Sequence, residues 1–275
     1  MKYPLVIALL LGSLCYCHAQ TTTVPVPKKG KFYLYWGWNA DRFATSDIHF
    51  TGLDYDFTLY DVVANDRLDK FSFNRHLNPN YATIPQYNFR VGYFLNDHLN
   101  VSFGIDHMKY VMQANQSVKV SGHIAGTNTD YDGTYAYEEL VLRPGFLQYE
   151  HTDGLNYLNL GLRHLGFLTG TNNIRLNYLG GLEAGILVPR TNVTLFDQER
   201  HDEFHLSGYG VSSMLGLQVE FFHSFFIQTE VKASFLNLPD VLTTYSDTDR
   251  ASQQILFSQF NIVLGTTLWG GCGAK

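Results

Sequence analysis

Eight segments of this sequence alternate apolar and polar side chains with a period of two, and no other feature restricts the fold as strongly. In the first segment Phe32, Leu34 and Trp36 share one face, and the residues between them share the other. A helix would repeat its apolar positions every three or four residues instead. Each segment is about ten residues long, which is the length of a tilted strand that crosses a bilayer. The segments span residues 32–41, 86–93, 99–106, 157–163, 174–188, 208–221, 225–235 and 259–268.

This pattern predicts an all-β fold, an antiparallel up-and-down transmembrane β-barrel of eight strands. One face of each strand is apolar throughout and suits lipid, whereas the other is polar, rich in glycine and suits a narrow lumen. A soluble sandwich or lipocalin-like barrel, with its apolar face turned inward, is the alternative. Charged residues in the middle of the strands and an export signal favour the membrane barrel.

The connections between the segments alternate in length, as they do in outer-membrane barrels. They are short at 96–98, 169–173 and 223–224, and long at 44–85, 113–154, 191–203 and 238–252. This alternation places both termini on the periplasmic side and four long, structured loops outside. Strand-like runs within 46–64 and 116–150 leave ten or twelve wall strands open, but we favour hairpins that extend the barrel above the membrane.

The third segment contains an irregularity after Asp106. Met108, Tyr110 and Met112 share the face of Asp106, although earlier apolar residues of the segment lie on the opposite face. A β-bulge at the membrane rim would shift the phase of a strand in this way. We therefore predict a bulge at Asp106 and His107.

The N-terminus has the character of a cleaved signal peptide. Lys2 precedes an apolar run over residues 5–11, and Ala19 supplies a small residue at the cleavage position. The predicted organisation is a signal peptide at 1–19, a periplasmic lead at 20–30, the barrel at 31–269 and a C-terminal tail at 270–275. Cys272 alone of the three cysteines remains after cleavage, so no internal disulfide can form.

Composition agrees with a barrel better than with helical membrane spans. Aromatic residues make up 15% of the chain and charged residues only 16%, against roughly 25% charged residues in soluble domains. The mean hydropathy is nevertheless −0.11, and no apolar stretch of about 18 residues follows the signal. The net charge of −6 argues against a nucleic-acid partner.

Charged residues of both signs fall on the face predicted to line the lumen. Because side chains nearly fill an eight-stranded barrel, we expect these groups to pair and to close the lumen, with a narrow solute path as the alternative. The predicted lumen charges are Arg90, Asp106, Arg163, Arg175, Glu183, Glu220, Glu230 and Lys232.

Glu150, His151 and Asp153 are the best candidates for a catalytic site, because they cluster in a predicted loop near a strand end. An imidazole beside a carboxylate can act as a general base or bind a divalent metal. The spacing matches no known metal or hydrolase motif, and no serine lies in a Gly-x-Ser-x-Gly frame. Whether any metal binds is left open, and no cofactor is expected.

The chain resembles small outer-membrane β-barrel proteins of Gram-negative bacteria. Its richness in aromatic residues, Asn and Tyr is similar to that of uncharacterised barrels of the Bacteroidetes. The likeness rests on the signal, the eight alternating segments and the aromatic-rich final strand from Phe257 to Trp269. It implies an outer-membrane location with outer-membrane lipid and lipopolysaccharide as partners, and envelope proteins contacting loops 44–85 and 113–154. A non-enzymatic role in envelope structure or surface interaction is our leading hypothesis. The alternatives are a lipid-modifying acyl hydrolase and a narrow transporter for a small or apolar solute.

Overall fold

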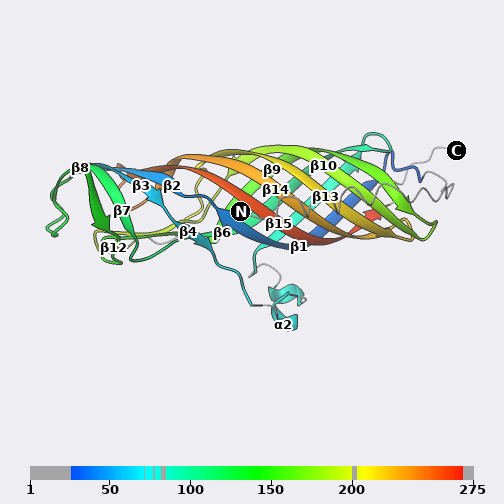
Figure 1. The fold of residues 1–275 in the computed structure, drawn as a ribbon, viewed down its shortest axis with the longest axis horizontal. Coiled ribbons are helices and arrows are strands. Elements are labelled where there is room, and N and C mark those ends of the chain that lie inside the picture. Colours follow the sequence, from blue (N-terminus) through cyan, green and yellow to red (C-terminus); the bar gives the residue numbers. More distant parts are fainter. Residues whose placement is uncertain (1–25, 71, 77, 82–84, 200–202, 269–275) are drawn as a thin grey trace, which may run out of the picture.

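The computed structural model describes residues 26–70, 72–76, 78–81, 85–199 and 203–268. They form an elongated antiparallel β-barrel whose strands cross the long axis obliquely (Figure 1). The predicted signal peptide 1–19 and tail 270–275 lie outside the described residues, as does the first half of the predicted lead 20–30. Among the described residues, no helix is long and apolar enough to cross a bilayer.

Eight strands close the barrel, and we call them the ring. They are hydrogen-bonded in the order β1-β5-β6-β9-β10-β13-β14-β15, and β15 pairs again with β1. All eight pairings are antiparallel, which confirms the predicted fold class. The ring strands are β1 (Phe32–Phe43), β5 (Tyr87–Phe94), β6 (Leu99–Met112), β9 (Leu147–Gly170), β10 (Ile174–Leu187), β13 (Gly208–Phe221), β14 (Phe225–Leu242) and β15 (Arg250–Leu268).

The lengths of the connections between the strands distinguish the two ends of the barrel. Short turns join β5 to β6, β9 to β10 and β13 to β14 at one end, which we call the turn end. The four remaining connections are long and meet at the other end, the loop end, as the sequence predicted. The connection between β1 and β5 also carries the short helices α2 (Phe73–His76) and η2 (Pro79–Tyr81).

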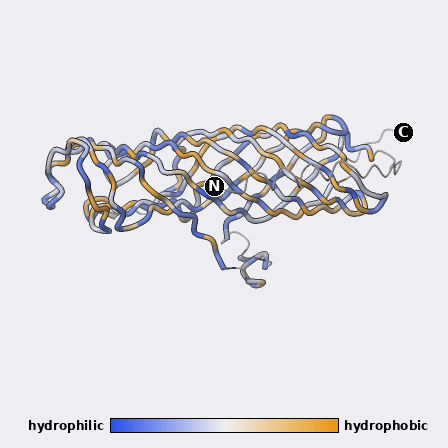
Figure 2. Tube along the Cα trace, viewed as in Figure 1, coloured by the Kyte–Doolittle hydropathy of each residue, from blue (hydrophilic) through white to orange (hydrophobic). Residues whose placement is uncertain are grey.

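The two faces of the ring wall differ in polarity. Leu182 and Val231 point outward and are 68% and 58% exposed, whereas their neighbours Glu183 and Lys232 are 3% and 1% exposed inside the ring. Hydrophobic and hydrophilic positions alternate along the ring strands in the same way (Figure 2). The predicted assignment of apolar residues to the outer face is therefore correct.

Beyond the ring, the long connections fold into a second structure at the loop end, which we call the head. β2 (Ser46–Thr51) pairs with the upper part of β15, and β3 (Tyr55–Val62), β7 (Ser117–Ile124) and β8 (Gly133–Val141) follow in order. β4 (Ala64–Asp66) pairs with β6, and β11 (Asn192–Leu195) pairs with β9 and β12 (Gln198–Glu199). The extra strand-like runs are thus hairpins above an eight-stranded ring and not additional wall strands.

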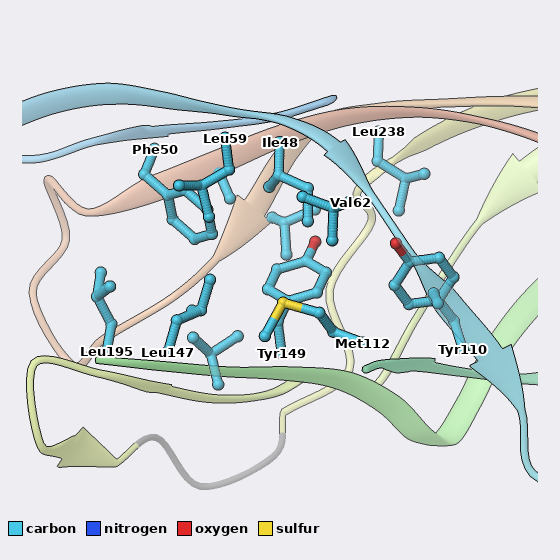
Figure 3. Packing of buried hydrophobic residues seen from close by; sticks show 14 of the residues in the cluster. Ile48, Phe50, Leu59, Val62, Tyr110, Met112, Leu147, Tyr149, Leu195 and Leu238 are labelled. Carbon is cyan, nitrogen blue, oxygen red and sulfur yellow. The ribbon is translucent and has the colours of Figure 1, made fainter. Parts of the chain in front are cut away.

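The head has its own hydrophobic core. Ile48 and Phe50 from β2 and Leu59 from β3 face Tyr149 from β9 and Leu195 from β11 across the interior (Figure 3). All five side chains are at most 1% exposed. The interior of the head is therefore apolar, whereas that of the ring is largely polar, with a smaller apolar cluster near the turn end that includes Phe94, Leu165 and Phe226.

The predicted bulge at Asp106 and His107 is wrong, and this change in the polarity of the interior explains the pattern that suggested it. β6 keeps a regular register with β5 through His107, and Met108, Tyr110 and Met112 are buried on the same inward face as Asp106. The strand does not shift phase there, because the interior that it lines becomes apolar. The register irregularity of β6 against β9 lies between Met108 and Tyr110.

Candidate functional site

A compact cluster of six charged side chains occupies the interior of the ring, and we call it the lumen cluster. Every member is at most 3% exposed, so each charge must be balanced by its neighbours rather than by water. Three cations and three carboxylates give the cluster no net charge. Its members are Arg90 from β5, Asp106 from β6, Arg163 from β9, Glu183 from β10, and Glu230 and Lys232 from β14.

Glu183 is the hub of the lumen cluster. Its carboxylate lies 3.0 Å from Nη2 of Arg90 and 2.6 Å from Nζ of Lys232, and it also pairs with Arg163. Arg163 reaches Oε1 of Glu230 at 2.7 Å, and Lys232 also pairs with Asp106. One carboxylate thus connects cations from three strands that are far apart in the sequence.

Neutral polar side chains supply further hydrogen bonds to the cluster. Arg90 donates to the Tyr35 hydroxyl at 2.9 Å, to Ser102 Oγ at 3.1 Å and to Asn159 Oδ1 at 2.8 Å. Asn88 donates to Asp106 at 2.6 Å. Hydrogen bonds of this kind offset the cost of burying charges, although Nε of Arg163 has no hydrogen-bond partner within the described part of the chain.

The other predicted lumen charges lie nearer the turn end. The Lys28 ammonium, from the segment before β1, enters the barrel and contacts Glu220 at 2.8 Å. Arg175 pairs in register with Glu220 and lies 4.4 Å from the centre of the Phe167 ring. The sequence does not predict this role of Lys28, because the residue precedes the first alternating segment and no periodicity marks it.

A hydrogen-bonded turn holds this N-terminal segment against the barrel. The backbone N–H groups of Lys28 and Lys29 donate to Oδ1 of Asp97 at 2.8 and 3.0 Å. The bonds from Lys29 and Lys28 lower the pKa of the Asp97 carboxyl.

The interior leaves little free space. A cavity of about 20 Å³ lies beside Tyr33, Phe94 and Arg163 near the turn end, which is room for about one water molecule. Towards the loop end the lumen cluster is followed directly by the apolar core of the head. The geometry is that of a packed interior.

The three candidate catalytic residues lie on β9 where the ring meets the head. Glu150 is 6% exposed and accepts from Nη2 of Arg67 at 3.0 Å. His151 is fully buried, and its Nδ1 lies 2.7 Å from Oγ1 of Thr191. The side chain of Asp153 lies outside the described residues.

His151 is surrounded by aromatic rings. The centroids of Tyr149 and Tyr110 lie 5.2 and 5.8 Å from its own. Burial lowers the pKa of the imidazole to about 3, so the ring is neutral at physiological pH. A hydroxyl and a neutral imidazole do meet here, but inside a packed core that gives a substrate no access.

No group of three or more His, Cys, Asp and Glu side chains that could hold a metal ion occurs in the described part of the chain.

Comparison with known proteins extends only to the class of fold. No protein-family model matches the sequence, and no curated protein matches it. Solved structures similar to this chain are small outer-membrane barrels. Outer membrane protein AlkL is 10% identical with a TM-score of 0.40, and the match covers 90% of this chain and 94% of that chain. OprG from Pseudomonas aeruginosa is 10% identical with a TM-score of 0.37, covering 88% and 97%. Neisserial surface protein A is 9% identical with a TM-score of 0.29, covering 86% and 98%. Similarity this low transfers no residue's role to this chain.

Proposed function

We propose that this chain is an outer-membrane β-barrel of a Gram-negative bacterium with a closed lumen, and that it acts through the folded head that it displays at the cell surface. The observation that carries the proposal is the continuous filling of the interior, first by the lumen cluster and then by the apolar core of the head. A solute path would have to cross both, and each is closely packed.

The outer surface of the ring supports a membrane location. Bulky apolar side chains stay exposed on every ring strand; Leu160, Leu182 and Leu215 are between 68% and 72% exposed. Soluble proteins rarely leave so extensive an apolar belt in water. Lipid around the ring accounts for it, with the turn end in the periplasm and the head outside.

The head supplies the surface for interaction. The predicted partner loops 44–85 and 113–154 contribute β2, β3, β7 and β8 to it. Among the described strands β8 pairs only with β7, and most of its residues are exposed; Tyr137 is 55% exposed. We infer that an envelope protein contacts this outermost hairpin.

Conductance tests the closed lumen. Purified protein reconstituted in planar bilayers is expected to give no stepwise conductance, because the lumen cluster and the head core block the interior. Heat-modifiable migration of the same sample on a gel shows that the barrel is folded. Stable conductance steps from a folded sample would contradict the closed lumen and favour the transporter alternative.

Labelling of whole cells tests the orientation. In a Cys272→Ser background, Thr129→Cys in the β7–β8 turn is expected to react with a membrane-impermeant maleimide. Asn173→Cys in the β9–β10 turn is the matched control and is expected to react only after lysis. The reverse pattern would refute the orientation. The mass of the exported protein tests cleavage after Ala19.

The hydrolase alternative receives less support. His151 has no surface exposure, and Glu150 is engaged by Arg67. A His151→Ala variant is therefore expected to leave the acyl content of outer-membrane lipid unchanged. Loss of a deacylated species in that variant would instead support the hydrolase alternative.

A further inference from the structure

A groove of about 810 Å³ crosses the outside of the ring, over β10, β13, β14, β15 and β1. Its floor is a row of residues in register: Leu182 pairs with Ser213, Ser213 with Ala233, Ala233 with Ser258, and Ser258 with Arg42. We call it the wall groove. On the proposed orientation its only surroundings are lipid.

Rows of bulky side chains flank the floor of the wall groove on both sides, and the row nearer the head lines the groove itself. Val211, Phe235 and Leu256 pair in register on the side nearer the head. Leu215, Val231 and Phe260 pair in register on the side nearer the turn end. The small residues Ser213, Ala233 and Ser258 lie between these two apolar rows, and such a lining suits a hydrocarbon chain.

The wall groove ends at a free cation. Arg42 is exposed on the outer face of β1, and no hydrogen bond or ion pair engages its guanidinium within the described part of the chain. A cation that borders lipid is costly unless an anion accompanies it. Arginine is the side chain best suited to a phosphate, since its donors can bind two oxygens at once.

A second, polar cleft of about 600 Å³ continues the groove towards the head, and we call it the rim cleft. Phe235 and Leu256 line both, so the two are contiguous. Besides Phe235, Leu256, Pro239 and the His49 imidazole, the rim cleft is lined by hydroxyl, amide and carboxylate groups: Thr45, Asp47, Asp61, Asn237, Ser252 and Gln254.

An interruption of the β-ladder creates the rim cleft. β1 pairs with β15 as far as Phe43 opposite Phe257, and β2 resumes the pairing at Ile48 opposite Gln253. The Ala44 N–H still donates to the Leu256 carbonyl at 2.9 Å, and residues 45–47 then leave the ladder with β15. On the other side of β15, the register of β14 is irregular between Leu238 and Val241.

We propose that the wall groove and the rim cleft together bind a phosphorylated glycolipid of the outer leaflet, lipopolysaccharide, through its lipid A part. This assignment rests on the order of the chemical groups along the site. An apolar groove suits an acyl chain, a single arginine at its end suits a phosphate, and a cleft of hydroxyl, amide and carboxylate groups suits the hydroxyls of a sugar. The inference rests on the proposed membrane orientation, because only then does the wall groove face lipid.

The test is native mass spectrometry of the full chain in detergent micelles, titrated either with bisphosphorylated lipid A or with lipid A freed of its phosphates. Wild-type protein is expected to bind the phosphorylated form about tenfold more tightly, as for a charge-assisted arginine–phosphate contact. Arg42→Gln is expected to remove this preference. Ala233→Phe, which fills the groove floor, is expected to weaken both forms.

Two matched variants act as controls. Thr229→Phe places the same bulk on the outer face of β14 but outside the groove, and Lys119→Gln removes an exposed cation from β7 in the head. Both are expected to bind like wild type. The proposal is overturned if Arg42→Gln keeps the phosphate preference, or if Ala233→Phe binds like Thr229→Phe.

Insertion into phosphatidylcholine vesicles, read by heat-modifiable migration, separates this proposal from the one on which it rests. Wild-type protein that fails to insert contradicts the membrane barrel itself. Protein that inserts but does not distinguish the two forms of lipid A contradicts only the glycolipid site.

Discussion

Glu183 at the hub of the lumen cluster offers the sharpest test of how the ring is held together. Replacing it with glutamine keeps the size of the side chain but removes the charge that faces Arg90, Arg163 and Lys232. Three buried cations would then share two carboxylates, Asp106 and Glu230. The cluster would carry one uncompensated positive charge in an interior from which water is excluded.

The expected cost follows from this count. Removing one partner of a buried ion pair typically costs 3–5 kcal/mol, because the remaining charge keeps its desolvation penalty. Glu183→Gln is therefore expected to lower the free energy of unfolding by about 4 kcal/mol, or roughly a thousandfold in the folding equilibrium constant. The residual hydrogen bonds of the amide set the lower end of this range.

Reversible urea unfolding in lipid vesicles, followed by tryptophan fluorescence and by heat-modifiable migration, measures this loss. Glu138→Gln is the matched control, because Glu138 carries the same charge at an exposed position of β8. If Glu183→Gln and Glu138→Gln unfold at the same urea concentration, the lumen cluster contributes nothing specific and the argument from its geometry fails.

Three further predictions concern the head and the N-terminal segment. Phe57→Ala is expected to lower the free energy of unfolding of the head by ~3–5 kcal/mol, because Phe57 is 1% exposed and its phenyl ring stacks at 5.1 Å on that of Phe50. Faster amide exchange in β2 and β3, with unchanged heat-modifiable migration of the barrel, would show this loss. His151 has a pKa lowered to about 3 in the folded head, against 6.5 in the unfolded chain. As pH falls from about 6.5 to the folded pKa, the free energy of unfolding of the head is therefore expected to fall by about 1.4 kcal/mol per pH unit. Amide exchange of β9 against pH is expected to lose that slope in His151→Phe, and an unchanged slope would refute it. Because the pKa of Asp97 is lowered in the folded state, its hold on the N-terminal segment is present above the unfolded value of about 3.9 and is lost as pH falls through the folded pKa. The amide resonances of Lys28 and Lys29 should move over that range, and should not move in Asp97→Asn.

The sequence predicts the ring well because alternation determines which face of a strand is apolar. Leu182 and Glu183 are assigned to opposite faces by parity alone, and the structure agrees. Parity does not determine the height of a residue within the barrel. That Glu183 meets Arg90 and Lys232 depends on the register of strands far apart in the sequence, so the pairing within the cluster could not be predicted.

The candidate site on β9 shows a second limit. Glu150 and His151 were expected in a loop, but β9 begins at Leu147 and runs for 24 residues. A strand this long reaches beyond any bilayer, and its outer part is buried by β2 and β11 of the head. Proximity in sequence to a strand end was therefore no guide to exposure.

The head can be recognised in the sequence from the polarity of the inward-facing positions along a single strand. On β14 the inward side chains are Glu230, Lys232 and Ser234, and then Leu236 and Leu238. Lipid outside the ring requires apolar residues outward and allows polar residues inward, whereas water outside the head requires the reverse. The switch between Ser234 and Leu236 thus marks the boundary between lipid and water on the proposed orientation. The same reasoning places the switch on β6 between Asp106 and Met108, where a change of solvent, and not a bulge, moves the apolar residues to the other face.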